Sequence, residues 1–250
     1  MPRANRFYIP SGVWHITHRC HNCDFLLKFD RDRLRWKFWL FQAKKRFGIS
    51  VLNYMVTSNH VHLLVRDTSD QSISRSIQLI AGRVGQEYNR RKSRKGAFWE
   101  DRYFATAVAT DQHLFQCLVY IDLNMVRAGV VTHPCQWKVC GYNEIQAPPM
   151  RYRIIDLNGL SDLTGFNDQT AFRRQHRKWV ESHLNGGKSC REPHWTESVA
   201  VGTESFVESF KSQSRSKLHY RSIAQTSSDT FVIKEAECSY QAHLNEKRAI

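Results

Sequence analysis

The chain has 250 residues, a formal net charge of +14, a hydrophobic content of 41% and an aromatic content of 12%. These values predict one or two domains with a packed core. No apolar run approaches the roughly 20 residues that a membrane-spanning helix needs, and the first residues show no apolar secretory signal. We therefore expect a cytoplasmic protein without a membrane partner.

The positive charge is concentrated in the first part of the chain. Lys and Arg minus Asp and Glu gives 22 − 11 = +11 for residues 1–149 and 15 − 12 = +3 for residues 150–250. A basic domain concentrates polyanions near its surface, which points to nucleic acid as a partner. Ribosomal and membrane-surface proteins share this property, so charge alone does not identify the partner.

Seven cysteines at irregular spacing argue against a disulfide framework. The segment 20–23, Cys-His-Asn-Cys, has the spacing of half a zinc knuckle. A second ligand pair would have to come from Cys135 and Cys140 with His133. The favoured interpretation is that these are free thiols, with a zinc site as the minor alternative.

Hydrophobic periodicity and capping residues define the elements of the first part of the chain. In chain order they predict a strand at 13–19, a helix at 30–47, strands at 51–57 and 60–66, a helix at 72–91, a strand at 104–109 and a helix at 111–128. This β-α-β-β-α-β order with one added helix predicts an α+β, ferredoxin-like fold. Its antiparallel sheet should carry helices mainly on one face.

Two finer expectations concern the first helix and the region beyond residue 149. Leu34, Phe38 and Phe41 suggest the apolar face of helix 30–47, with Arg31 and Arg35 on a basic face. Pro148-Pro149 marks the boundary between a domain of residues 1–149 and an extension of residues 150–250. The extension should hold helices at 168–184 and 204–210, a break at 185–189 and a loosely ordered last thirty residues.

His60 and His62 are the first candidate functional residues. Side chains alternate between the two faces of a strand, so these imidazoles point the same way while Val61 and Leu63 point to the other face. Two imidazoles on a rigid strand make half of a metal site, although neutral imidazole suits Zn²⁺ or Mn²⁺ better than Mg²⁺. The alternative is a pair of surface histidines on a solvated sheet face.

Tyr120 and Asn124 are the second pair of candidates. They are four residues apart in the predicted helix and share a face, which Arg127 continues. A phenol can attack phosphorus to form a phosphotyrosine, and a metal on the phosphate oxygens would act as Lewis acid. The Asn124 carbonyl oxygen would complete the metal shell. The alternative is a half-buried helical tyrosine with a polar neighbour.

Cations and aromatic residues follow one another on and after the helix at 72–91. The cations are Arg75, Arg83, Arg90, Arg91, Lys92, Arg94, Lys95 and Arg102. The aromatic residues are Phe98, Trp99, Tyr103 and Phe104. Cations that contact phosphates and rings that stack on unpaired bases are typical of single-strand binding. The equally weighted alternative is a solvated helix end followed by a strand that packs its aromatic side chains inward.

At these residues the sequence resembles the single-tyrosine HUH transposases, and among them the REP-associated tyrosine transposases. The resemblance covers roughly residues 8 to 145. The motifs are Trp14-His15-Ile16-Thr17-His18-Arg19, Asn59-His60-Val61-His62-Leu63-Leu64-Val65, Tyr88-Asn89-Arg90-Arg91, Gly96-Ala97-Phe98-Trp99-Glu100-Asp101-Arg102-Tyr103 and Tyr120-Ile121-Asp122-Leu123-Asn124-Met125-Val126-Arg127-Ala128-Gly129. Met125 departs from the Pro that many relatives carry there.

The resemblance implies a function and its residues. His60 and His62 match the metal ligands, Asn124 a further ligand and Tyr120 the nucleophile, with Mg²⁺ or Mn²⁺ as cofactor. The family binds a DNA hairpin, cleaves single-stranded DNA beside it through a 5′-phosphotyrosine and rejoins it. We also expect Arg19 and Arg127 to contact the DNA.

The same resemblance leaves several questions open. The protein is expected to be nucleoid-associated and either a monomer or a homodimer. The segment 195–202 looks like tail segments of some relatives, which suggests an accessory DNA contact. The alternative function is a DNA hairpin-binding protein without catalysis.

Overall fold

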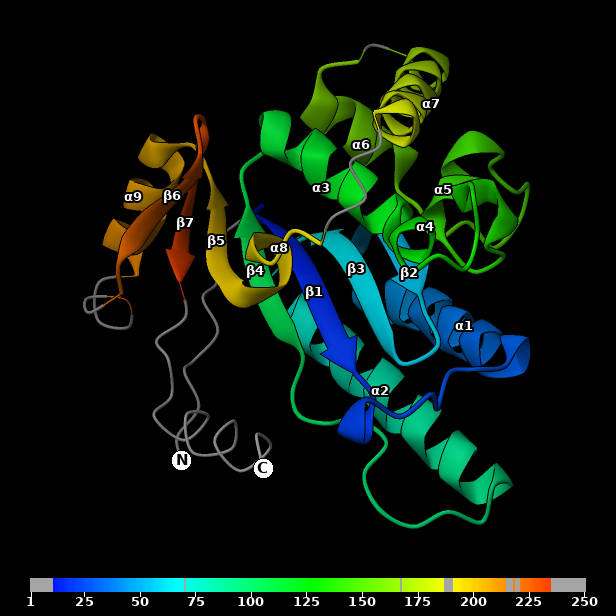
Figure 1. The fold of residues 1–250 in the computed structure, drawn as a ribbon. Coiled ribbons are helices and arrows are strands. Elements are labelled where there is room, and N and C mark those ends of the chain that lie inside the picture. Colours follow the sequence, from blue (N-terminus) through cyan, green and yellow to red (C-terminus); the bar gives the residue numbers. More distant parts are fainter. Residues whose placement is uncertain are drawn as a thin grey trace.

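The computed structural model describes residues 11–69, 71–166, 168–186, 191–214, 218 and 221–234. Seven strands form one sheet in the order β2-β3-β1-β4-β5-β7-β6 (Figure 1). The strands are β1 (Val13–Arg19), β2 (Ser50–Val56), β3 (His60–Arg66), β4 (Phe104–Val108), β5 (Ser198–Gly202), β6 (Ile223–Ser227) and β7 (Thr230–Lys234). The helices are α1 (Asp30–Phe47), α2 (Ser72–Arg91), α3 (Gln112–Asp122), α4 (Asn124–Arg127), α5 (Gly141–Gln146), α6 (Leu157–Thr164), α7 (Gln169–Asn185), α8 (His194–Glu197) and α9 (Glu204–Gln213).

The first four strands confirm the ferredoxin-like α+β prediction. They lie in the order β2-β3-β1-β4, and each neighbouring pair is antiparallel. The predicted boundaries of these strands and of α1 and α2 agree with the structure to within one residue. Register places Ile16 opposite Leu63 and His15 opposite Leu64, so adjacent residues of β1 and β3 serve opposite faces of the sheet.

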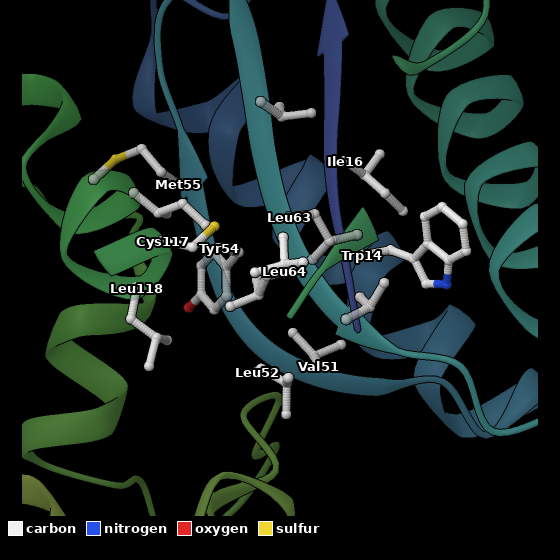
Figure 2. Close-up of a cluster of buried hydrophobic side chains, with 14 of the residues drawn as sticks. Trp14, Ile16, Val51, Leu52, Tyr54, Met55, Leu63, Leu64, Cys117 and Leu118 are labelled. Carbon is white, nitrogen blue, oxygen red and sulfur yellow. The ribbon is translucent and has the colours of Figure 1, made fainter. Parts of the chain in front are cut away.

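One face of the sheet packs against α1 and α2. The Trp36 ring of α1 lies 6.4 Å from the Tyr54 ring of β2, and Phe98 packs on Gly85 of α2. Figure 2 shows Trp14 and Ile16 on one side of these strands, and Cys117 and Leu118 of α3 on the other. Both faces are therefore buried, and the expectation that helices cover mainly one face is wrong.

The buried face of α1 also differs from the prediction. Trp36, Leu40 and Ala43 are buried, whereas Leu34 and Phe38 are 41% and 40% exposed. The sequence of this helix offers two apolar stripes, and packing of the Trp36 side of the helix against the sheet decides between them. The predicted apolar face is thus wrong for Leu34 and Phe38, whereas Phe41 is partly buried and packs against the core.

The helix predicted at 111–128 is divided. Asp111 caps α3 as predicted, with its side chain accepting from the backbone N–H of His113. The helix ends at Asp122, and a short second helix, α4, begins at Asn124 after Leu123. Gly129, with φ of +67°, ends this segment as expected.

Residues beyond 149 extend the same sheet. β5 pairs in parallel with β4, with Ala107 opposite Ala200, and β7 and β6 follow as an antiparallel hairpin. The sheet therefore continues past the predicted domain boundary. The expectation of loose order is wrong for residues 223–234, while residues 235–250 lie outside the described residues. The helix expected at 168–184 is present as α7, and Asp168 is its N-cap. Most of the predicted break at 185–189 lies outside the described residues.

The minor zinc interpretation is contradicted. Among the described residues, no group of three or more His, Cys, Asp or Glu side chains is placed to hold a metal ion. Cys20 and Cys140 are buried, and their backbones form isolated β-bridges with Trp99 and with Met55 of β2, respectively. Burial raises the pKa of both thiols to about 12.

Candidate active site

The paired histidines of β3 meet the tyrosine of α3 on the second face of the sheet. The His62 ring lies 5.9 Å from the Tyr120 ring, and His15 of β1 lies 6.0 Å from it (centroid distances). His62 is 2% exposed and Tyr120 4%, because α3 and α8 cover this face. The solvated-surface interpretation of the histidine pair is therefore wrong for His62.

Hydrogen bonds fix which nitrogen of His60 carries the proton. Asn59 donates its amide N–H to the Cys23 carbonyl at 3.2 Å, which leaves its oxygen 2.7 Å from His60 Nδ1. An amide oxygen only accepts, so Nδ1 of His60 carries hydrogen. In the neutral ring, Nε2 then presents a lone pair. Burial is the main cause that lowers the pKa of His60 to about 4.

A relay of hydrogen bonds from Trp195 through His15 fixes the tautomer of His62. His15 Nδ1 lies 2.8 Å from the Trp195 carbonyl, which only accepts, so His15 carries its proton there. Burial lowers the pKa of His15 to about 4, so the ring is neutral and its Nε2 accepts. The partner at 2.9 Å is His62 Nδ1, which must donate. His62 Nε2 is thus left with a lone pair, and burial holds the pKa of this ring well below its usual value.

The Nε2 atoms of His60 and His62 lie close together. They are 3.1 Å apart, and the assigned tautomers leave both without hydrogen. Ligands at right angles on a Mg²⁺ ion, at 2.0–2.1 Å each, are about 3 Å apart. Manganese accepts the same combination of imidazole and oxygen ligands. The two imidazoles therefore fit a shared divalent cation by the distance between their Nε2 atoms.

Asn124 joins this pair from α4 despite the break in the helix. Its side-chain nitrogen lies 2.9 Å from His62 Nε2 and donates to it. The nitrogen, rather than the predicted oxygen ligand, faces the histidine in this conformation. A half-turn of the amide exchanges the two atoms, so the side chain is placed to present its oxygen to a cation.

Arg127 and Trp195 enclose Tyr120. The Arg127 guanidinium lies 4.1 Å from the ring centroid and donates to the Tyr120 carbonyl at 2.5 Å. The Trp195 ring lies 6.1 Å away. Burial raises the pKa of the phenol, and the cations Arg127 and Arg191 oppose that rise. Bringing a further cation close to the phenol would favour its ionised form.

The predicted DNA-contacting cations occupy several parts of the molecule. Arg19 lies opposite His60 in the β1–β3 pair, and Arg127 contacts Tyr120. The remaining cations lie on α2, on the face of the sheet away from Tyr120, or in the segment after it. Most are exposed: Arg75, Arg83, Arg90, Lys92, Lys95 and Arg102. Two others make internal contacts, since Arg91 pairs with Asp32 and Arg94 donates to the Ala97 carbonyl.

Three of the four aromatic residues after α2 follow the inward-packing alternative. Phe98 and Tyr103 are buried. Trp99 stacks on His18 with ring centroids 4.1 Å apart and donates to the Ala81 carbonyl. The fourth, Phe104, is only half-buried, and its pairing with Thr17 places it on the same face of the sheet as His62.

Two residues of the site were not found as candidates in the sequence. His15 belongs to a quoted motif, and its place on a strand facing β3 was the available signal. Trp195 was suggested only as an accessory DNA contact, and its contact with His15 spans 180 positions. No local pattern predicts such a contact.

A ferredoxin-like sheet with a His-Val-His strand beneath a tyrosine-bearing helix is the arrangement that the resemblance to HUH transposases predicts. Residues 13–124 match the family model described as "Transposase IS200 like". Over these residues, somewhat less than half of the chain, the match supports the predicted resemblance. No curated protein matches the chain.

Two solved structures are similar to the chain. One is the structure of a REP-associated tyrosine transposase bound to a REP hairpin, with 18% identity and a TM-score of 0.48 over 59% of this chain and 87% of that one. The other is described as a "putative transposase" from Deinococcus radiodurans R1, with 18% identity and a TM-score of 0.35 over 48% of this chain and 95% of that one. No helix among the described residues is long and apolar enough to cross a membrane.

Proposed function

We propose that the protein is a transposase of the REP-associated tyrosine type that binds hairpin-containing single-stranded DNA, cuts it and rejoins it. The observation that carries this proposal is the 3.1 Å separation between the Nε2 atoms of His60 and His62, beside the Tyr120 ring. The quoted sequence motifs and the basic first half of the chain support DNA as the substrate.

The chemistry assigned to Tyr120 is nucleophilic substitution at phosphorus. The phenol loses its proton, its oxygen forms a bond to the scissile phosphorus, and the bond to the 3′ oxygen breaks. The products are a 5′-phosphotyrosine and a free 3′ hydroxyl, and attack by another 3′ hydroxyl reverses the step. Arg127 is placed to favour the phenolate.

His60, His62 and Asn124 would hold Mg²⁺ or Mn²⁺ in this proposal. When bound, such a cation polarises the phosphate and orients it for attack. The protein's contribution is to keep both imidazoles neutral and to direct their Nε2 atoms to one point. A hairpin-binding protein without catalysis is the alternative.

Covalent capture of DNA tests the proposal. Labelled single-stranded DNA that carries the palindromic repeats flanking the gene is incubated with the protein and Mg²⁺ or Mn²⁺, then analysed on a denaturing protein gel. We expect a labelled band at the protein's mass that is lost in Tyr120→Phe and in chelator. Tight hairpin binding without this band, across several repeat substrates, would instead support the non-catalytic alternative.

A further inference from the structure

We infer that the segment of residues 191–197, outside the family match, is part of the active site because it positions His62 through His15. The Trp195 carbonyl accepts from His15 Nδ1 at 2.8 Å, and His15 Nε2 accepts from His62 Nδ1 at 2.9 Å. The inference rests on the proposed function only in assigning cation binding to His62 Nε2.

The surroundings of Trp195 hold its carbonyl in place. Its indole is fully buried, and its N–H donates to Glu192 at 2.9 Å. The Thr106 hydroxyl of β4 donates to the Ser198 carbonyl at 2.7 Å and lies 3.2 Å from the Trp195 carbonyl, and the following strand, β5, pairs with β4. The acceptor for His15 is therefore held by the sheet itself.

Without this relay, the neutral His62 ring has two tautomers. In one of them Nε2 carries hydrogen and has no lone pair for a cation. His15 favours the other by accepting from Nδ1, the role that partners of metal-binding histidines have in general. His15 is a positioning residue in this scheme, since it acts through His62.

Nitrogen NMR of the histidine rings tests the tautomer directly in the full-length, metal-free protein. We expect hydrogen on Nδ1 and a bare Nε2 for His62. Hydrogen on Nε2 would overturn the inference. Because no DNA or activity enters, this result is separate from the outcome of the capture assay.

Two variants test the consequence for cation binding, with Mn²⁺ alone as the probe and electron paramagnetic resonance as the readout. His15→Leu removes the acceptor, and we expect Mn²⁺ affinity to fall about 10- to 100-fold. His15→Gln keeps both a donor and an acceptor and should restore most of the affinity. Equal affinity in wild type and a folded His15→Leu would overturn the inference. Absence of Mn²⁺ binding in wild type with the expected tautomer would overturn the proposed metal use and leave the relay supported.

A separate surface carries a second inference: we infer that Phe25 and Phe29 form a stacking platform for unpaired bases of the substrate strand. Both rings are exposed, at 65% and 57%. The ammonium groups of Lys28 and Lys92 lie 6.0 and 5.7 Å from the Phe29 ring. Exposed rings beside cations are the combination that binds single strands without base specificity.

The platform adjoins the candidate active site. Leu27 donates its backbone N–H to the Ser58 carbonyl at 2.9 Å, and Asn59 donates to the Cys23 carbonyl. The turn at Ser58-Asn59 leads directly into His60. A strand whose phosphate lies at the histidines can therefore continue over this segment. The inference rests on the proposed substrate.

A matched pair of variants tests the platform. We expect Phe25→Ala/Phe29→Ala to weaken binding of a single-stranded (dA)20 by tenfold or more, since each stacked base contributes about 1–3 kcal/mol. Phe38→Ala, another exposed ring with a guanidinium 4.5 Å away, should change it less than about twofold. Unchanged binding in the double variant, with covalent capture intact, would overturn the platform alone. A concentration-dependent dimer of wild type that the double variant loses would overturn it by assigning the surface to a second copy.

Discussion

The two faces of the ferredoxin-like sheet are both covered, yet they bury different chemistry. Facing α1 and α2 are apolar side chains such as Ile16 and Leu63. Facing α3 and α8 are His15, His62 and Thr106, which are equally buried and are hydrogen-bonded. Burying a polar group is unfavourable unless it is paired, so an apolar side chain would stabilise the fold more simply at these positions. The difference indicates that the first face serves stability, and it supports the reaction proposed for the second.

The polar face continues beneath the tyrosine helix. His176 of α7 donates to Asp122 at 2.7 Å, and Asn53 of β2 donates to the other oxygen of that carboxylate at 3.0 Å. All three side chains are fully buried. This network connects α3 to both β2 and α7, and so fixes the helix on which Tyr120 stands.

The largest effect is expected from removing polarity at His62. In His62→Leu, cleavage should fall by about 10³-fold, because several kcal/mol of metal-assisted stabilisation of the transition state is lost. The free energy of unfolding should fall by about 1–3 kcal/mol, because the buried His15 Nε2 loses its hydrogen-bond donor. Covalent capture rates and urea unfolding measure the two quantities. Capture at the wild-type rate would show that His62 is not a ligand.

The next effect is a pH dependence of the free energy of unfolding in the metal-free protein. It comes from the buried histidines of the second face. The pKa values of His15 and His60 are near 4 when folded and near 6.5 when unfolded. The unfolded chain therefore binds more protons between these values, and stability falls as pH drops from 6.5 toward 4. Urea unfolding in chelator at pH 7.5, 6 and 5 measures this. His15→Gln should reduce the slope, and a free energy independent of pH would contradict the assigned neutral rings.

The smallest effect on the reaction is expected from the apolar face. Leu63→Ala leaves a cavity beneath α1 and α2 and should lower the free energy of unfolding by about 2–5 kcal/mol. Covalent capture per folded molecule should stay near wild type, since Leu63 points away from the histidines. A capture defect as large as that of His62→Leu would mean that the two faces are not separate in function.

The contrast between the faces also explains what the sequence could predict. Alternation on β3 correctly places His60 and His62 together, and the predicted cap at Asp111 is present. The buried face of α1 was missed because local periodicity does not say which stripe meets the sheet. The break at Leu123 carries no Gly or Pro, so no local signal marks it. The strands β5, β6 and β7 were missed because pairing with β4 is long-range, whereas the helix expected at 204–210 is present as α9.

The hydrogen bond between His15 and Trp195 has a consequence for the order of synthesis. β1, β3 and Tyr120 leave the ribosome before the carbonyl that holds His15 exists. At 5–20 residues per second, translating from residue 120 to residue 195 takes roughly 4 to 15 s. During that interval the nascent chain has its histidines and its nucleophile but lacks the acceptor for the relay. The segment around Trp195 is thus the last part of the site to be synthesised.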